Sequence, residues 1–226
     1  MATTVTATGT PATGGTAPSL FERAVAWAAA HRQATTYAGV IVVLAAGLFW
    51  WNRLSTRRSE AIARDELLQA RAAFESKNYP FAASELSKIA ENYSGTMAAS
   101  EATLLLGQAR LLQGQAQQAV AVLEGFAPRA HRAYRAQAYG LLGAAYENLG
   151  RPVEAAAAYM SGAEAAELGF LEAQLLSDAA RAYVAAGNTA QALEAYRRIV
   201  GTLGETPSAP EARVRIGELT KGAGVP

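Results

Sequence analysis

A small residue that recurs at an almost constant interval constrains the fold of this chain more than any other feature. It is found at Ala70, Gly107, Gly143, Ala180 and Gly217, at intervals of 37, 36, 37 and 37 residues. Around each position the apolar residues follow the 3.6-residue period of a helix. Units of this length are too short to be domains, and they bury their apolar faces by stacking on one another. The pattern predicts an all-α solenoid.

Two further features keep the same period. Turn residues recur at 77–79, 114–116, 150–152 and 187–189. After each turn comes an alanine that is followed four residues later by a large side chain. These pairs are Ala82 and Leu86, Ala119 and Leu123, Ala155 and Tyr159, and Ala192 and Tyr196. Each unit is therefore expected to be a helix, a turn and a second helix, with the small residues allowing close approach.

The segment 139–159, YGLLGAAYENLGRPVEAAAAY, contains one unit in full. It resembles the tetratricopeptide repeat, W-x2-L-G-x2-Y followed by A-x3-F, with Tyr139 in place of Trp and Tyr159 in place of Phe. The resemblance implies about four helix pairs and a capping helix within a repeat domain at 54–221. The period exceeds the usual 34 residues, so part of each unit is extended. The expected units are 60–95, 99–127, 130–167 and 171–203, and the capping helix is 209–220.

The front of the chain predicts a different organisation. Residues 1–18 are Thr, Ala, Gly and Pro without a charge, which predicts a disordered tail. Ser19 and Glu22 have capping-box spacing and begin a short juxtamembrane helix at 19–32. Residues 33–52 then carry no charge, and as a helix they extend about 30 Å, the thickness of the bilayer core. This predicts a transmembrane helix at 33–53.

Two alternatives to a membrane span are less consistent with the sequence. A buried helix of a soluble protein would need a core on every side, and the neighbouring sequence offers none. A cleaved signal peptide would need small residues at its end, whereas this stretch ends in Phe49, Trp50 and Trp51. Because residues 52–77 contain neither Gly nor Pro, the helix is expected to continue unbroken into the first repeat.

Charge is distributed unevenly along the chain. Residues 1–58 carry five Arg and one Glu, whereas residues 59–226 carry 15 Lys or Arg and 18 Asp or Glu. A mildly acidic repeat domain argues against a nucleic-acid partner. Near the predicted span, more arginines lie on its C-terminal side than on its N-terminal side. Taken alone, this count favours repeats that face the cytoplasm.

Residues suited to catalysis or metal binding are missing from the sequence. The chain has no cysteine, and its two histidines, His31 and His131, have no second histidine or carboxylate pair at ligand spacing. No phosphate-binding, dinucleotide-binding or nucleophile-elbow motif occurs. The sequence therefore predicts a protein that is not an enzyme and has no cofactor and no metal.

If the tetratricopeptide frame holds, specific positions of each first helix line a partner groove. The predicted groove residues are Arg64, Arg71, Phe74, Glu101, Gln108, Leu111, Gln137, Glu147, Gln174, Asp178, Arg181 and Val184. They do not include the run of Lys and Asn with which chaperone-binding members of that family hold a terminal carboxylate. Amides, alternating charges and scattered apolar groups suit an extended or helical protein segment instead. The alternative is that these residues form an ordinary solvated face.

The order of the parts also resembles a narrower family. A short N-terminal helix, a span that ends in the Trp-rich segment 47–52 and a rod-like start to alanine-rich repeats are similar to the YfgM-type proteins of the bacterial inner membrane. That resemblance implies a cytoplasmic N-terminus and periplasmic repeats, in disagreement with the arginine count. It also implies a role ancillary to the Sec translocon, with translocon subunits, periplasmic chaperones or client chains as partners.

The expected function is that of a non-enzymatic adaptor for protein–protein interaction, held to the lipid bilayer by residues 33–53. Two alternatives use the same surface. The chain could be a structural accessory subunit of a larger membrane complex, or a cell-envelope assembly factor.

Overall fold

The computed structural model describes Trp27 and residues 32–221, without the side chains of residues 32, 34, 35, 38 and 51–57. The predicted tail at 1–18 lies outside the described residues. Of the predicted juxtamembrane helix at 19–32, only Trp27 and Arg32 are described, and both are helical. The chain divides into two compact units, Met1–Leu54 and Ser55–Pro226.

In the first unit, the described residues from 32 onward belong to helix α2 (Arg32–Glu75). Several of its apolar side chains, including Val40, Leu44 and Trp50, are more than half exposed. Within the described part of the chain, no helix combines the length and the apolarity needed to cross a bilayer. The stretch 33–53 is thus helical, but the structure does not support its prediction as a transmembrane helix.

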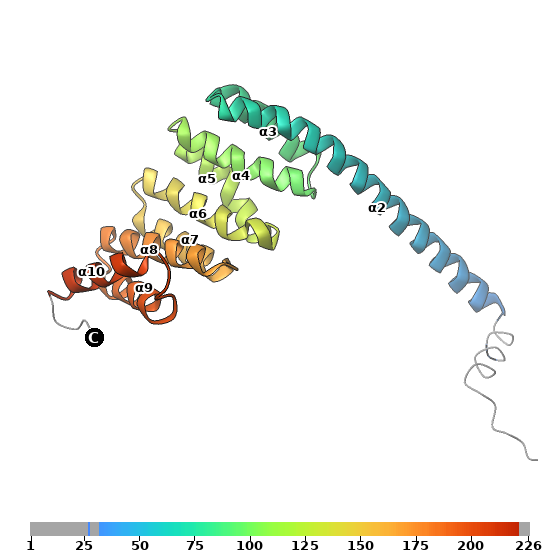
Figure 1. Ribbon diagram of the computed structural model, residues 1–226. Helices are drawn as coiled ribbons and strands as arrows, with labels where there is room; N and C mark the ends of the chain where they lie inside the picture. The colour runs from blue at the N-terminus through green and yellow to red at the C-terminus, as the bar shows by residue number, and fades with distance from the viewer. Residues whose placement is uncertain (1–26, 28–31, 222–226) are drawn as a thin grey trace, which may run out of the picture. The chain divides into compact units, whose positions relative to one another are not determined.

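The second unit is built from helix pairs, and its described residues contain no strand. The end of α2 pairs with α3, α4 with α5, α6 with α7, and α8 with α9, while α10 packs on α9 (Figure 1). The helices are α3 (Tyr79–Asn92), α4 (Met97–Leu112), α5 (Ala116–Phe126), the short 3₁₀ helix η1 (Ala127–Arg129), α6 (Arg132–Asn148), α7 (Pro152–Ala165), α8 (Gly169–Ala185), α9 (Thr189–Thr202) and α10 (Ala209–Leu219). The prediction of an all-α solenoid is confirmed.

The core of the second unit follows the helix pairs rather than forming one centre. Leu86 and Ile89 lie in a cluster shared by α2, α3 and α4. Leu123, Leu176 and Ile199 belong to a larger cluster that runs from α5 to α10. Most of the other buried positions are alanine, which allows helices to pack closely.

One turn geometry recurs between the two helices of each pair. Lys77, Gly114, Gly150 and Gly187 have φ angles of 62°, 71°, 68° and 77°. The backbone N–H of the residue after each of them donates to the carbonyl five residues earlier, at 2.8 to 2.9 Å. This is the Schellman ending of a helix, which needs a left-handed residue and therefore favours glycine. The recurring glycines of the sequence thus mark the ends of the first helices.

Lys77 is the one non-glycine residue among these four left-handed positions. The substitution Lys77→Gly is therefore expected to stabilise the protein. An L-residue in the left-handed region is strained, and removing that strain should raise the free energy of unfolding by about 1 kcal/mol. Urea denaturation followed by circular dichroism measures the change. The matched control, Gly150→Lys, should lower the free energy of unfolding by a similar amount. An unchanged or lower stability of Lys77→Gly would contradict the prediction.

The recurring small residue lets the two helices of a pair come close. A Cβ atom at Gly107 would lie 2.8 Å from the Leu123 side chain, and one at Gly143 would lie 2.6 Å from the Tyr159 ring. Both are closer than real Cβ contacts. The alanine at the equivalent place, Ala180, is fully buried. Leu123 and Tyr159, the large side chains after two of the second-helix alanines, therefore pack directly on the small residue of the first helix.

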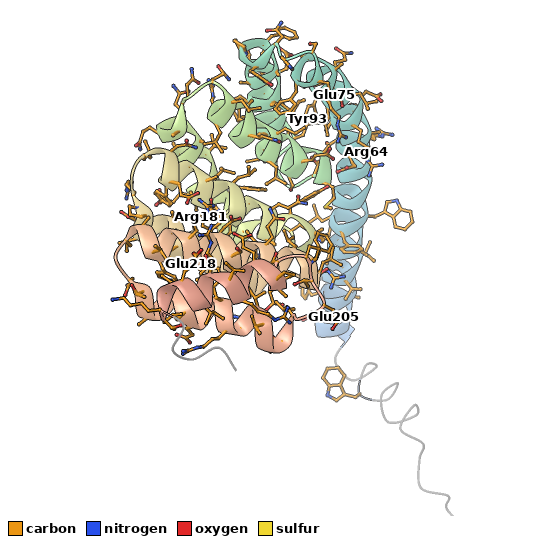
Figure 2. The ribbon with its side chains drawn as sticks, turned by 60° about the vertical axis from the view of Figure 1, so that its left-hand side comes forward. Arg64, Glu75, Tyr93, Arg181, Glu205 and Glu218 are labelled. Atoms are coloured by element: carbon orange, nitrogen blue, oxygen red, sulfur yellow. The ribbon has the colours of Figure 1, made fainter. Side chains whose placement is uncertain are left out.

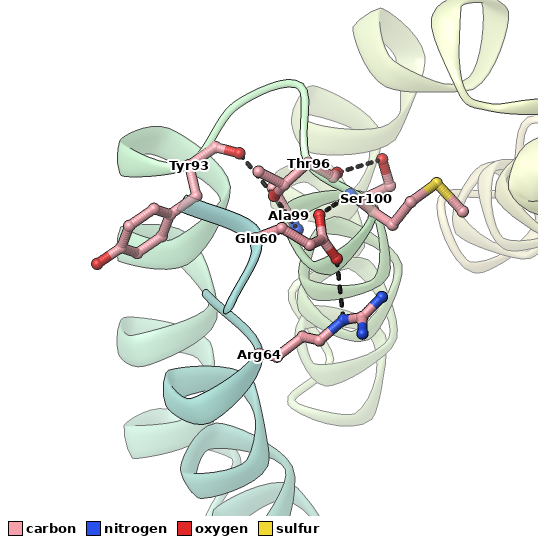
Figure 3. A network of polar contacts seen from close by, with 7 residues as sticks. Glu60, Arg64, Tyr93, Thr96, Ala99 and Ser100 are labelled. Carbon is pink, nitrogen blue, oxygen red and sulfur yellow. Dashed lines mark hydrogen bonds and ion pairs between the residues drawn. The ribbon is translucent and has the colours of Figure 1, made fainter. Parts of the chain in front are cut away.

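A polar network fixes the start of α4, as Figure 3 shows. Glu60 of α2 accepts a hydrogen bond from the backbone N–H of Met97 at 2.8 Å and another from Arg64 at 3.1 Å. The side chain of Thr96 accepts from the N–H of Ala99 at 3.0 Å as the N-cap. These contacts satisfy N–H groups that the first turn of a helix leaves free, and a carboxylate is favoured at that end. They hold α4, which contributes to the cavity described next.

Candidate functional site

The second unit contains a cavity of about 680 Å³, here called the central cavity. Its wall comes mainly from α4, α6 and α8, with Arg71 of α2 and Tyr159 of α7. Five leucines are among its lining residues: Leu104, Leu105, Leu141, Leu171 and Leu175. A cavity of this size with an apolar wall and a few polar groups is suited to binding.

Six of the predicted groove residues line the central cavity: Arg71, Glu101, Gln108, Gln137, Gln174 and Asp178. They lie on first helices at related positions of the repeat, so stacking the units brings them to one surface. The side chains of Gln108, Gln137 and Gln174 are exposed and make no hydrogen bond with any described residue. That these six residues bind a partner stays a prediction.

Two other predicted residues lie in a second cavity. Arg181 and Val184 line a space of about 330 Å³ between α8, α9 and α10, here called the terminal cavity. Asp178 borders both cavities. Figure 2 shows Arg181 and Glu218, which line the terminal cavity from α8 and α10. Eight of the twelve predicted groove residues therefore line one of the two cavities.

The remaining four predicted residues line neither cavity. Arg64 bonds to Glu60, and Figure 2 shows it on α2. The ring of Phe74 packs edge-on against Tyr79, with centroids 5.4 Å apart. Leu111 is half-buried against the core, and Glu147 is engaged in hydrogen bonds to Tyr159 and Arg181. Contacts within and between helix pairs engage these four side chains, and their part in a partner groove stays a prediction.

The leucines of the cavity wall were missed in the sequence. Leu105 and Leu141 each lie two residues before the recurring small residue, at Gly107 and Gly143. Asp178 holds the same place before Ala180. The repeat period could thus have identified these positions, whereas Tyr134, from the first turn of α6, shows no signal of its own.

Arg71 of the central cavity and Arg181 of the terminal cavity each pair with two carboxylates. Arg71 lies 3.1 Å from Glu101 and 3.6 Å from Glu75. Arg181 lies 2.7 Å from Glu147 and 2.8 Å from Asp178. Both arginines bridge successive first helices, α2 to α4 and α6 to α8, so they link neighbouring units as well as setting the charge at the cavity.

Burial changes the ionisation of the groups between the two cavities. Burial raises the pKa of Asp178, although the hydrogen bond from Arg181 acts in the opposite sense. Burial, and then the hydrogen bond to Glu147, raises the pKa of Tyr159 far above its usual value. The hydrogen bond to Asp178 raises the pKa of Arg181. Tyr159 is therefore a neutral donor, 2.7 Å from Glu147, and Arg181 is a permanent cation.

Five tyrosines with raised pKa values are expected to make the fold less stable at alkaline pH. Burial raises the pKa of Tyr134, Tyr146, Tyr159 and Tyr196, and the hydrogen bond to Glu66 raises that of Tyr93. Tyrosines of the unfolded chain ionise near pH 10, while these ionise at a higher pH in the fold. Their contribution is present below about pH 10 and is lost as the pH rises toward the folded pKa values.

The substitution Tyr159→Phe removes the ionisable hydroxyl of one of these tyrosines and so measures its contribution. Above pH 10 the free energy of unfolding of the wild type should fall by about 1 kcal/mol more per pH unit than that of the variant. Urea denaturation between pH 8 and pH 11 measures both slopes. Parallel slopes would contradict the assignment of Tyr159 as a buried, protonated tyrosine.

No group of three or more His, Cys, Asp or Glu residues among those that the structure describes is placed to hold a metal ion. What lines the cavities is amide, hydroxyl, aliphatic and paired ionic groups. Such groups can hold a polypeptide through hydrogen bonds and apolar contact.

Comparison with known proteins agrees with this architecture. Residues 55–177, more than half of the chain, match the model of the Tetratricopeptide repeat-like domain. None of the curated proteins compared with the chain matches it. Proteins with this fold are typically non-enzymatic scaffolds for protein–protein interaction, and no catalytic family is indicated.

Solved structures show the same fold. Two crystal structures of nearly identical TPR-like repeats, from a Podosopora anserina protein designated a kinesin light chain, are similar to this chain. One of them carries a single substitution. Each has a TM-score of 0.57 and 20% identity, and the match covers 72% of this chain and 87% of the other. By its matched sequence model and its helix-pair architecture, the chain belongs to the tetratricopeptide repeat-like family.

Proposed function

We propose that this protein is a non-enzymatic adaptor that holds segments of other proteins in its central cavity. The observation that carries the proposal is the composition of the cavity wall. Three exposed glutamine amides without hydrogen-bond partners among the described residues lie around a leucine-rich surface. Amides can both donate to and accept from a peptide backbone, and leucines bind apolar side chains, so together they suit a polypeptide.

Cross-linking from inside the cavity tests the proposal. A photoreactive amino acid replaces Gln108 in the full-length protein, and the matched control carries it at Glu194, an exposed position of α9 that lines neither cavity. Cross-links to other proteins should form from position 108 and be several-fold fewer from position 194. Equal yields from the two positions would refute the cavity as the binding surface.

The set of cross-linked proteins, together with purification in mild detergent, separates an adaptor from a structural subunit. An adaptor should give cross-links to several different proteins and no stable complex. A structural accessory subunit should give one partner in a stoichiometric complex that persists in high salt after extraction in mild detergent. The second result would leave the family assignment intact and change the function.

The proposal includes attachment to a lipid bilayer through residues 33–53. It is supported by the 20 uncharged residues at 33–52 and by the exposed apolar side chains of this part of α2. Burying such side chains in lipid is favourable, whereas a charge among them opposes insertion. The full-length protein should float with phosphatidylcholine vesicles on centrifugation. The substitution Val42→Glu should lower the fraction of protein that floats. Val214→Glu, which changes an exposed valine of α10, is the control.

The proposed location is the bacterial inner membrane, with the N-terminus in the cytoplasm and the repeats in the periplasm. The support is the resemblance to YfgM-type proteins, which also suggests a role ancillary to the translocon and its chaperones. The chain has no cysteine, so Ala190→Cys in exposed α9 provides a single label site. A membrane-impermeant maleimide should label it in spheroplasts. Labelling only by a permeant reagent would reverse the orientation.

A further inference from the structure

The charges at the central cavity are out of balance. Its wall contains one cation, Arg71, and two carboxylates, Glu101 and Asp178. The arginines that pair with these carboxylates do not correct this, because Arg71 is shared with Glu75, and Arg181, which lies outside the wall, is shared with Glu147. The lining of the central cavity therefore carries one more negative than positive group.

These carboxylates can accept further hydrogen bonds. Glu101 and Asp178 each bond an arginine through one oxygen, Oε1 and Oδ1, and the second oxygen of each has no partner among the described residues. Their side chains are only 30% and 28% exposed, so water screens them less than it screens a surface carboxylate. The raised pKa of Asp178, which burial causes, also indicates incomplete compensation of its charge.

The rest of the cavity wall is neutral. Apart from Arg71, Glu101 and Asp178 it consists of uncharged residues, mainly glutamines, leucines and two tyrosines, Tyr134 and Tyr159. The hydroxyl of Tyr134 makes no hydrogen bond with a described residue, so it is available to a ligand. Leu105 and Leu141 occupy equivalent places in two successive units and continue the apolar surface from one unit to the next.

We propose that the central cavity selects segments of other proteins that combine apolar side chains with a lysine or arginine. The leucines bind the apolar side chains, the glutamine amides bond the backbone, and the unshared carboxylate oxygens of Glu101 and Asp178 accept from the basic group. An acidic segment is disfavoured, because like charges across an interface oppose binding. This selectivity rests on the proposed function, binding of protein segments in the same cavity.

Three immobilised peptides test the charge preference. The probes are Lys-Leu-Ala-Leu-Val-Leu-Ala-Lys and its two analogues with Glu or Gln in place of both Lys, each biotinylated and attached to a biosensor. The full-length protein is applied in non-ionic detergent. The Lys peptide should bind about fivefold more tightly than the Glu peptide, and the difference should shrink as the salt concentration rises. Equal or tighter binding of the Glu peptide would overturn the proposal.

Substitutions of opposite charge at Gln137 test whether the charge preference arises in the central cavity. This side chain lines the cavity, is exposed and makes no hydrogen bond with a described residue, so its replacement should leave the fold intact. Gln137→Lys should weaken binding of the Lys peptide about fivefold, and Gln137→Glu should strengthen it by a similar factor. Glu194→Gln changes the net charge as much as Gln137→Lys but lies outside both cavities, so it should have no effect.

The outcomes separate this inference from the proposed function. If the Glu peptide binds better and the Gln137 variants shift it in opposite directions, the cavity binds protein segments but the inferred charge preference is wrong. If no peptide responds to either Gln137 variant, the cavity is not the binding surface, and the proposed function fails together with the inference.

Discussion

Leu123→Ala is expected to lower the free energy of unfolding by about 3 kcal/mol, as truncations of fully buried leucines do. Leu123 is completely buried in α5, and its side chain packs over Gly107 of α4. No Cβ atom is present at Gly107 to fill the space, so the substitution leaves a void between two helices. Urea denaturation followed by circular dichroism measures the loss. Leu112→Ala, at a half-exposed position, should change the stability by about 0.5 kcal/mol or less.

A double-mutant cycle tests the contact itself. Gly107→Ala alone should lower the free energy of unfolding by about 1 to 3 kcal/mol, because its Cβ atom would lie 2.8 Å from Leu123. In the Leu123→Ala background the same change meets no obstacle and partly fills the void. The double variant should therefore be more stable than the sum of the two single losses implies, by at least about 1 kcal/mol. Additive losses would show that the two residues are not in contact.

Gly143→Ala is expected to lower the free energy of unfolding by about 2 kcal/mol. Alanine normally favours a helix over glycine by about 1 kcal/mol, so a loss here would run against helix propensity. The reason is the Tyr159 ring, whose nearest atoms would lie 2.6 to 2.8 Å from the new Cβ atom. Tyr159 is buried, and its hydroxyl is bonded to Glu147, so the ring cannot move away without losing contacts.

Gly201→Ala is the matched control for this substitution. Gly201 also lies in a helix, α9, but an added Cβ atom would meet nothing within 4 Å. The free energy of unfolding of Gly201→Ala should stay unchanged or rise by up to about 1 kcal/mol. If Gly143→Ala were as stable as Gly201→Ala, the close approach of α6 and α7 at Gly143 would not exist in solution.

The regularities of the helix pairs could be predicted because they depend on neighbours close in sequence. A glycine such as Gly150 ends a helix through its own φ angle and through bonds that reach five residues back. The pairing of Gly143 with Tyr159 spans only 16 residues, and it recurs as Gly107 with Leu123. Spacing alone therefore located the turns, the small residues and the large side chains that cover them.

The candidate site was predictable only in part, because it depends on how successive units pack. Gln108, Gln137 and Gln174 were found from their places in the repeat, and they do line the central cavity. Phe74 and Leu111 were predicted in the same way, each four residues after the recurring small residue. Phe74 packs against Tyr79, however, and Leu111 packs against the core. A position in the repeat states which side of a helix a residue occupies, and the neighbouring helices decide whether its side chain is free.

By itself, the sequence determined that this protein is a stack of helix pairs and which residues set the distance within each pair, since those contacts are local and periodic. Only the tertiary structure decided which carboxylates share an arginine. Arg71 reaches Glu101 across 30 residues, and Arg181 reaches Glu147 across 34 residues. Such pairings depend on the packing between units, where the rotation of one unit on the next decides which charged side chains come within reach of each other.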